Sequence, residues 1–99
     1  MAEFAYNIFL KGDDRLLAIA DSTLLEKTFE EGDRHITVSK QFYGDKTCGR
    51  EEAKKLIMSA TIINAVGKEI IGLMIEENIA DKENILTIEG VPHAQVVSL

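Results

Sequence analysis

Two short segments of the chain hold side chains that could act on a ligand. In the first, His93 follows Pro92 and is separated from Gln95 by a single residue. A histidine beside a turn, with an amide close by, can serve as a general base or bind a phosphate. The same imidazole can instead be a structural group that fastens the turn to nearby carbonyls. The residue types leave both interpretations of His93 open, and they do not determine whether the Val91–Pro92 bond is cis.

The second segment contains Asn64 and Gly67, which lie three residues apart in an apolar stretch. A helix would place both residues on one face. Because glycine costs about 1 kcal/mol relative to alanine in a helix, Gly67 indicates either close packing against a strand or an opening onto a ligand. A buried Asn64 amide would need hydrogen-bond partners. Asn64, Gly67, His93 and Gln95 are therefore candidate binding residues.

A third candidate is the loop that carries Phe42 and Tyr43. Their rings can form a stacking platform for a base, with Lys40, Lys46 and Arg50 close by in sequence, or they can anchor the loop to the core. Residues 40–55 carry more cations than carboxylates, although the net charge of −6 opposes tight non-specific binding to nucleic acid. Tyr43, Lys46 and Arg50 are the candidate RNA contacts.

Length and composition predict one globular domain over residues 1–99, since the chain is 45% hydrophobic and its charges are dispersed. Cys48 is the only cysteine, which excludes an internal disulfide and favours a reduced, cytoplasmic setting. The spacing of Cys48, His35 and His93 predicts no zinc site, and no cofactor-binding motif is found. No signal peptide and no apolar run of about 18 residues is present, so no membrane association is expected.

The elements that must position these residues follow from hydrophobic patterning. Residues 4–11 and 16–20 flank a Gly-Asp-Asp turn and predict a β-hairpin. The second arm alternates poorly, which suits a central strand covered on both faces. The other short elements expected are a helix at 22–31 and strands at 34–39, 85–88 and 94–97.

Residues 51–79 have the apolar spacing of a long helix. One helix of that length would measure about 43 Å, too long for a domain of about 13 Å radius of gyration, so we expect a break at 59–61. The helix expected after this break has apolar residues on most of its circumference. It therefore either lies in the centre of the domain or forms a dimer surface. The predicted fold is α+β, with a mostly antiparallel sheet of about five strands packed on this long broken helix plus one short helix, as a monomer or homodimer.

Three segments, at 42–44, 60–67 and 90–97, together resemble an archaeal family called domain of unknown function 424. The resemblance extends from about residue 6 to residue 99. It implies a compact archaeal protein and carries no activity with it. It also makes a shared site attractive, because the segments around Asn64 and His93 would then meet in space.

The function favoured by these features is a small non-enzymatic binding module whose partner is RNA or a protein. The resemblance adds archaeal information processing, with RNA or ribosome-associated proteins, as the setting. The alternative is an enzyme or ligand-binding protein that acts on a phosphorylated small molecule, with His93 as base and Asn64 and Gln95 orienting the substrate. Convergence of these three side chains on an open pocket would favour the ligand hypothesis.

Overall fold

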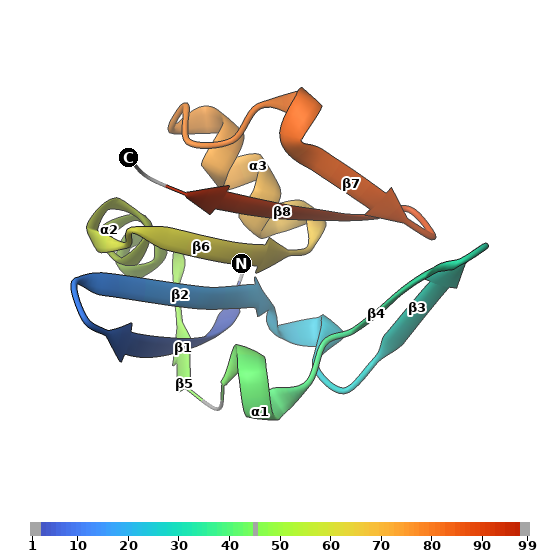
Figure 1. Ribbon diagram of the computed structural model, residues 1–99, viewed down its shortest axis with the longest axis horizontal. Coiled ribbons are helices and arrows are strands. Elements are labelled where there is room, and N and C mark those ends of the chain that lie inside the picture. Colours follow the sequence, from blue (N-terminus) through green and yellow to red (C-terminus); the bar gives the residue numbers. More distant parts are fainter. Residues whose placement is uncertain (1–2, 45, 98–99) are drawn as a thin grey trace.

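The computed structural model describes residues 3–44 and 46–97, which form one α+β domain built on a six-stranded sheet (Figure 1). The strand order is β5-β1-β2-β6-β8-β7, and a separate hairpin, β3–β4, stands beside the sheet. The strands are β1 (Phe4–Lys11), β2 (Asp14–Asp21), β3 (Thr28–Glu31), β4 (Arg34–Thr37), β5 (Lys46–Cys48), β6 (Ile62–Val66), β7 (Ile85–Ile88) and β8 (Val91–Val97).

Three α-helices connect these strands. They are α1 (Lys40–Tyr43), α2 (Arg50–Ser59) and α3 (Lys68–Glu76), and two 3-10 turns, η1 (Ser22–Leu24) and η2 (Lys82–Asn84), complete the described elements. None of the helices in the described ranges is long and apolar enough to span a membrane.

The sheet is antiparallel except where β2 pairs with β6. Two crossovers, β5-α2-β6 and β6-α3-β7, advance across the sheet in the same direction. Crossovers between parallel strands are almost always right-handed, so both helices are expected on one face. The core confirms this placement, because side chains of α2 and α3 pack into a single buried cluster with the sheet. We call this side of the sheet the helix face.

The other side, which we call the hairpin face, is covered by α1 and by β3–β4. Its buried centre consists of Ala18 and Ala20 from β2, Val66 from β6, and Val38 and Tyr43. The strand β2 is thus buried on both faces, as its poor alternation predicts, and its partner β1 forms the expected hairpin with it.

The helix expected at 22–31 is wrong. The chain makes a single 3-10 turn, η1, and then enters β3, in which Phe29 pairs with Ile36 of β4. The helical spacing of the apolar residues arises because Leu24, Leu25 and Phe29 all pack against the hairpin face. Tertiary packing therefore overrides the local pattern at this position.

The long broken helix is also wrong, although α2 does end at Ser59, within the expected break. Residues 62–66 form the central strand β6 rather than the start of a second helix. The β-branched run at 61–63 suits a strand. Its start is held by two hydrogen bonds with Arg15: the Thr61 N–H donates to the Arg15 carbonyl (2.9 Å), and the Arg15 N–H donates to the Thr61 side-chain hydroxyl (2.8 Å). The sheet has six strands rather than about five, because it gains β5 and β6, whereas the strand expected at 34–39 is β4, which pairs with β3 in the separate hairpin.

The C-terminal prediction is closer to the structure. The strand expected at 85–88 is β7, and the strand expected at 94–97 is part of β8, which begins three residues earlier at Val91. The Val91–Pro92 bond is trans. On α3, Ile70, Ile71, Leu73 and Met74 are buried in the domain's own core, which accounts for most of the apolar surface of this helix, while Ile75 remains 39% exposed.

Candidate functional site

A cleft of about 410 Å³ lies between the hairpin β3–β4 and the hairpin face of the sheet. We call it the hairpin cleft. It is lined by His35, Ile36, Thr37, Phe42, Tyr43, Asn64, Leu86, Ile88 and His93. Three of the residues singled out from the sequence, Tyr43, Asn64 and His93, therefore converge on one open cavity.

Strand register explains why Asn64 and His93 meet. In the β6–β8 pair, Asn64 lies opposite Gln95, and Val66 lies opposite His93. Directly opposed residues share a face of a sheet, so these residues all belong to the hairpin face. Gln95 is exposed and does not line the cleft, whereas Leu86 enters the lining because β7 places it opposite His93.

The hairpin is held over the cleft at both of its ends. At its base, Val38 is fully buried and exchanges backbone hydrogen bonds with Glu26 (2.6 Å) and Lys27 (2.9 Å). At its tip, the Glu89 carboxylate accepts a hydrogen bond from the Glu30 N–H, and the Glu31 carboxylate accepts one from the Glu89 N–H (2.8 Å). Figure 1 shows the tip lying toward the turn between β7 and β8. The roof of the cleft is thereby attached to the same strands that form its floor.

The polar ends of three lining side chains remain available to a ligand. The described residues contain no buried side-chain nitrogen or oxygen that lacks a partner. The Tyr43 hydroxyl, the Asn64 amide and the His93 imidazole make no hydrogen bond to another described residue, so these atoms must keep contact with solvent. For Tyr43, which is only 4% exposed, the hydroxyl is the part of the side chain that reaches the cleft.

Among the described residues, no carboxylate side chain lines the hairpin cleft. Burial lowers the pKa of His93 from its ordinary value, so its imidazole is uncharged and can both donate and accept a hydrogen bond. Burial raises the pKa of Tyr43 to about 12, so its hydroxyl keeps its proton. No lysine or arginine lines the cleft. The site therefore offers hydrogen-bonding groups and apolar walls rather than charge.

Aromatic side chains form one edge of the cleft. Phe42 stacks on Phe9, with ring centroids 5.6 Å apart and an interplanar angle of 16°, and meets Tyr43 edge to face at 4.9 Å. Phe42 remains 36% exposed, whereas Tyr43 is part of the buried cluster. Tyr43 thus anchors the segment to the core, and Phe42 presents a ring at the mouth of the cleft.

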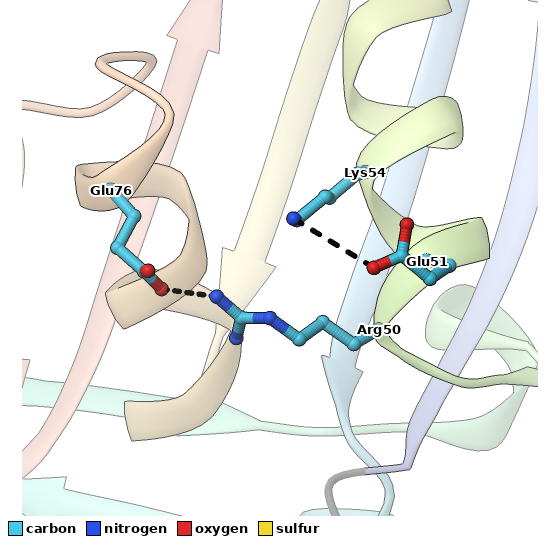
Figure 2. A network of polar contacts seen from close by, with 4 residues as sticks. All are labelled: Arg50, Glu51, Lys54 and Glu76. Carbon is cyan, nitrogen blue, oxygen red and sulfur yellow. Dashed lines mark hydrogen bonds and ion pairs between the residues drawn. The ribbon is translucent and has the colours of Figure 1, made fainter.

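Lys46 and Arg50 do not join the aromatic residues. Lys46 lies opposite Tyr6 in the β5–β1 pair, which puts it on the helix face, away from the cleft. Arg50 begins α2 and pairs with Glu76 of α3, while Lys54 lies 3.9 Å from Glu51 (Figure 2). The hydrogen bond from Arg50 lowers the pKa of Glu76. The predicted basic and aromatic loop is therefore divided between the two faces of the sheet.

Gly67 has a structural explanation outside the cleft. It lies between β6 and α3 with φ 125°, and a Cβ there would overlap the Asp21 carboxylate. That carboxylate accepts hydrogen bonds from the N–H groups of Glu69 and Ile70 (both 2.9 Å) at the start of α3. The expectation of close packing at Gly67 is confirmed, but the expectation that it shares a helix face with Asn64 is wrong, because Asn64 is in a strand.

Neither a reactive cysteine nor a metal cluster is found among the described residues. Cys48 is buried, and burial raises the pKa of its thiol to about 11, so it is no thiolate near neutral pH. Across residues 3–44 and 46–97, no three His, Cys, Asp or Glu side chains are grouped to hold a metal ion. His35 was missed as a site residue, because the position of its hairpin depends on tertiary contacts that no local sequence pattern encodes.

The fold and the cleft define a small α+β domain with a ligand-sized cavity on one sheet face, lined by no lysine, arginine or carboxylate among the described residues. The chain belongs to the family described as "Protein of unknown function (DUF424)", whose sequence pattern matches residues 10–99. It is similar to a solved structure of an uncharacterized conserved protein from Methanopyrus kandleri, with 27% identity, a TM-score of 0.80, and coverage of 99% of this chain and 95% of that chain. A comparison with curated proteins gave no match.

Proposed function

We propose that this protein is a non-enzymatic module that binds single-stranded RNA and holds one base in the hairpin cleft. The observation that carries the proposal is the convergence of Asn64, His93 and Tyr43 on a cavity with an aromatic edge. Their polar groups have no protein partner among the described residues, and they come from three separate elements. A ligand would supply the hydrogen bonds that the protein leaves unmade.

The chemistry of a nucleobase matches this lining. A base has flat apolar surfaces and a polar edge that carries both donors and acceptors. Phe42, Leu86 and Ile88 provide apolar surface, and stacking of a base on an aromatic ring contributes about 1–3 kcal/mol. The Asn64 amide and the neutral His93 ring can each donate and accept, as recognition of a base edge requires.

A cleft lined by no lysine, arginine or carboxylate among the described residues also suits the overall charge. With a net charge of −6, the protein repels a phosphate backbone over most of its surface. Affinity that came from base stacking and edge recognition would depend less on phosphate contacts, and therefore less on salt. We therefore expect selective binding whose affinity depends only weakly on salt, rather than non-specific binding along RNA.

The biological setting belongs to the same proposal. A role in archaeal information processing, in the cytoplasm and close to RNA or ribosome-associated proteins, is supported by the similarity to a Methanopyrus kandleri protein and by the proposed RNA ligand. The oligomeric state we expect is a monomer, because Ile70, Ile71, Leu73 and Met74 of α3 are buried within the domain and only Ile75 of its apolar side chains is exposed.

A catalytic function is the second candidate, because His93 and Asn64 do share an open cleft. In that case His93 would act as general base on a phosphorylated small molecule. The lining supplies no cation for the phosphate, however, and no carboxylate to orient the imidazole, so a binding function is the better match. Binding of phosphorylated metabolites, together with failure to bind RNA, would favour the catalytic candidate.

The test uses two matched substitutions on neighbouring strands. Asn64→Leu removes the amide from the cleft with little change in side-chain volume, and Gln95→Leu makes the same change at the exposed residue opposite it. Titrated with homopolymer RNA octamers, Asn64→Leu should lose most of its affinity while Gln95→Leu binds like the unmodified protein. Equal affinities for the two variants would contradict the proposal.

A further inference from the structure

A second hollow, of about 350 Å³, lies on the hairpin face on the other side of α1. It is lined by Asn7, Lys40, Gln41 and Gly44, and we call it the polar hollow. We infer that the polar hollow is the backbone subsite for an RNA whose base occupies the hairpin cleft, with Lys40 contacting a phosphate. This inference rests on the proposed function and assigns to the RNA a second point of attachment.

The single turn of α1 divides the two cavities by chemistry. Its first two residues, Lys40 and Gln41, line the polar hollow, and its last two, Phe42 and Tyr43, line the hairpin cleft. Four consecutive residues thus present a cation and an amide on one side and aromatic rings on the other. A nucleotide has the same division, with a charged backbone joined to an aromatic base.

The sheet sets the spacing between the two cavities. The polar hollow lies over β1 through Asn7, whereas the nearest strand of the cleft is β6 through Asn64, with only β2 between them. Neighbouring strands lie about 4.8 Å apart, so the backbones of β1 and β6 beneath the two cavities are about 10 Å apart. The backbone attached to a base in the cleft can cover that distance.

The floor of the polar hollow is arranged for donation to oxygen atoms. The Asn7 side-chain oxygen accepts a hydrogen bond from the Ile8 N–H (3.0 Å), which leaves the NH₂ group of the same amide for an acceptor. At Gly44, φ is 93° and a Cβ would overlap the backbone carbonyl of Tyr6. Glycine at this position therefore lets the end of α1 pack closely on β1, which holds Lys40 and Gln41 beside Asn7.

Among the described residues, the Glu26 carboxylate lies beside the subsite. The Glu26 side chain accepts a hydrogen bond from the Lys40 N–H (2.9 Å), so its negative charge opposes the binding of a phosphate near Lys40. Replacing Glu26 by glutamine keeps an oxygen for the Lys40 N–H and removes the charge. This substitution gives a test whose expected sign is opposite to that of removing the lysine.

The experiment measures the affinity of an RNA octamer for variants with matched charge changes, as a function of salt. Lys40→Gln should weaken binding on the order of five-fold, the upper end for one exposed ion pair, and should make the salt slope shallower by about 0.7, the value for one single-strand phosphate contact. Glu26→Gln should strengthen binding. Lys82→Gln, at an exposed lysine in η2, is the charge-matched control and should change neither quantity.

The outcomes separate the subsite from the cleft. If Asn64→Leu weakens binding but Lys40→Gln matches the Lys82→Gln control, the polar hollow is no subsite and the proposed function stands. If Lys40→Gln weakens binding and Asn64→Leu does not, the base is not held in the cleft, and both proposals are wrong. Absence of RNA binding by the unmodified protein also overturns both.

Discussion

At the scale of single residues, Gly67 has the most constrained backbone conformation near the core. Its φ of 125° and ψ of 151° fall in a region that is essentially restricted to glycine, and the Asp21 carboxylate fills the space a Cβ would need. We expect Gly67→Ala to lower the free energy of unfolding by about 2–4 kcal/mol, since backbone strain and steric overlap add. Urea denaturation measures this change directly.

Gly72 provides the matched control for that substitution. It lies in the middle of α3, on the solvent-exposed side of the helix, and no atom lies within 4 Å of the position of an added Cβ. Gly72→Ala should raise stability by about 0.5–1 kcal/mol, because alanine loses less backbone freedom in a helix. If the two variants had the same midpoint, the Asp21 contact would not be the reason for glycine at position 67.

His93 should make stability depend on pH. Because burial lowers the pKa of His93 in the folded protein, the unfolded chain takes up this proton at higher pH than the folded one does. The stability due to the neutral ring is complete above about pH 6.5 and decreases as pH falls through that value toward the folded-state pKa. Unfolding experiments between about pH 7.5 and 5.5 should show this decrease.

The comparison that isolates His93 is its replacement by glutamine. His93→Gln should flatten the decrease in stability over that pH range, and identical slopes for the two proteins would rule His93 out as its source. Asp21 has the opposite sign, because burial raises the pKa of its carboxyl, so its stabilising effect decreases as pH rises through the acidic range. Keeping the experiments above about pH 5.5 limits that contribution.

Sequence reasoning identified some site residues and missed others for a physical reason. His93 and Asn64 were recognisable as polar groups in apolar surroundings, and the structure places both in the cleft. Lys46 and Arg50 are near Tyr43 in sequence only, because β5 carries the chain to the other face of the sheet. A site assembled from β4, α1, β6, β7 and β8 depends on pairings between distant segments, which single-sequence patterns do not contain.

At the scale of elements, the hairpin β3–β4 is expected to be the part of the molecule that opens most readily. Most of its side chains are exposed, and its tip is fastened by the hydrogen bonds of Glu89 with Glu30 and Glu31. Glu89→Ala removes the carboxylate that accepts from the Glu30 N–H. Hydrogen exchange at that amide should accelerate, while amides of the central sheet keep their protection, because local opening does not require global unfolding.

Two other hydrogen-exchange results for Glu89→Ala would contradict this prediction. An unchanged exchange rate at Glu30 would mean that packing of Phe29 and Ile36 against the hairpin face holds the tip without Glu89. A uniform acceleration over the whole sheet would mean that the hairpin is part of the cooperative core rather than a separate cover of the cleft.

Helices and strands were predicted correctly where the spacing of apolar residues matches the faces that the folded domain buries. The β1–β2 hairpin has alternating residues on its first arm and a turn between the arms, and it forms as expected. The helix predicted at 62–66 was wrong because a short, mostly apolar run in a central strand matches a buried helix equally well. Only its position between β2 and β8 distinguishes the two.

At the scale of the whole molecule, two crossovers of the same hand place α2 and α3 on one face and leave the other face to a short helix and a hairpin. The helix face carries the larger apolar core, with a cavity of about 300 Å³ beside Ile57 and Ile79, whereas the hairpin face has a smaller buried cluster with two cavities beside α1. Stability and ligand binding are thereby assigned to opposite sides of one sheet. A ligand can enter the hairpin face without disturbing the main core.

The measurement that tests the central claim most directly is an NMR titration of the protein with a homopolymer RNA octamer. The account predicts that the side-chain amide of Asn64, the ring protons of His93 and the backbone amides of β4 shift together, with saturation at one RNA equivalent. The NMR signals of the α2 amides and of the Arg50 side chain, which lie on the helix face, should keep their chemical shifts. Shifts centred on α2 and β5, with Asn64 and His93 unaffected, would contradict the assignment of the hairpin cleft as the site.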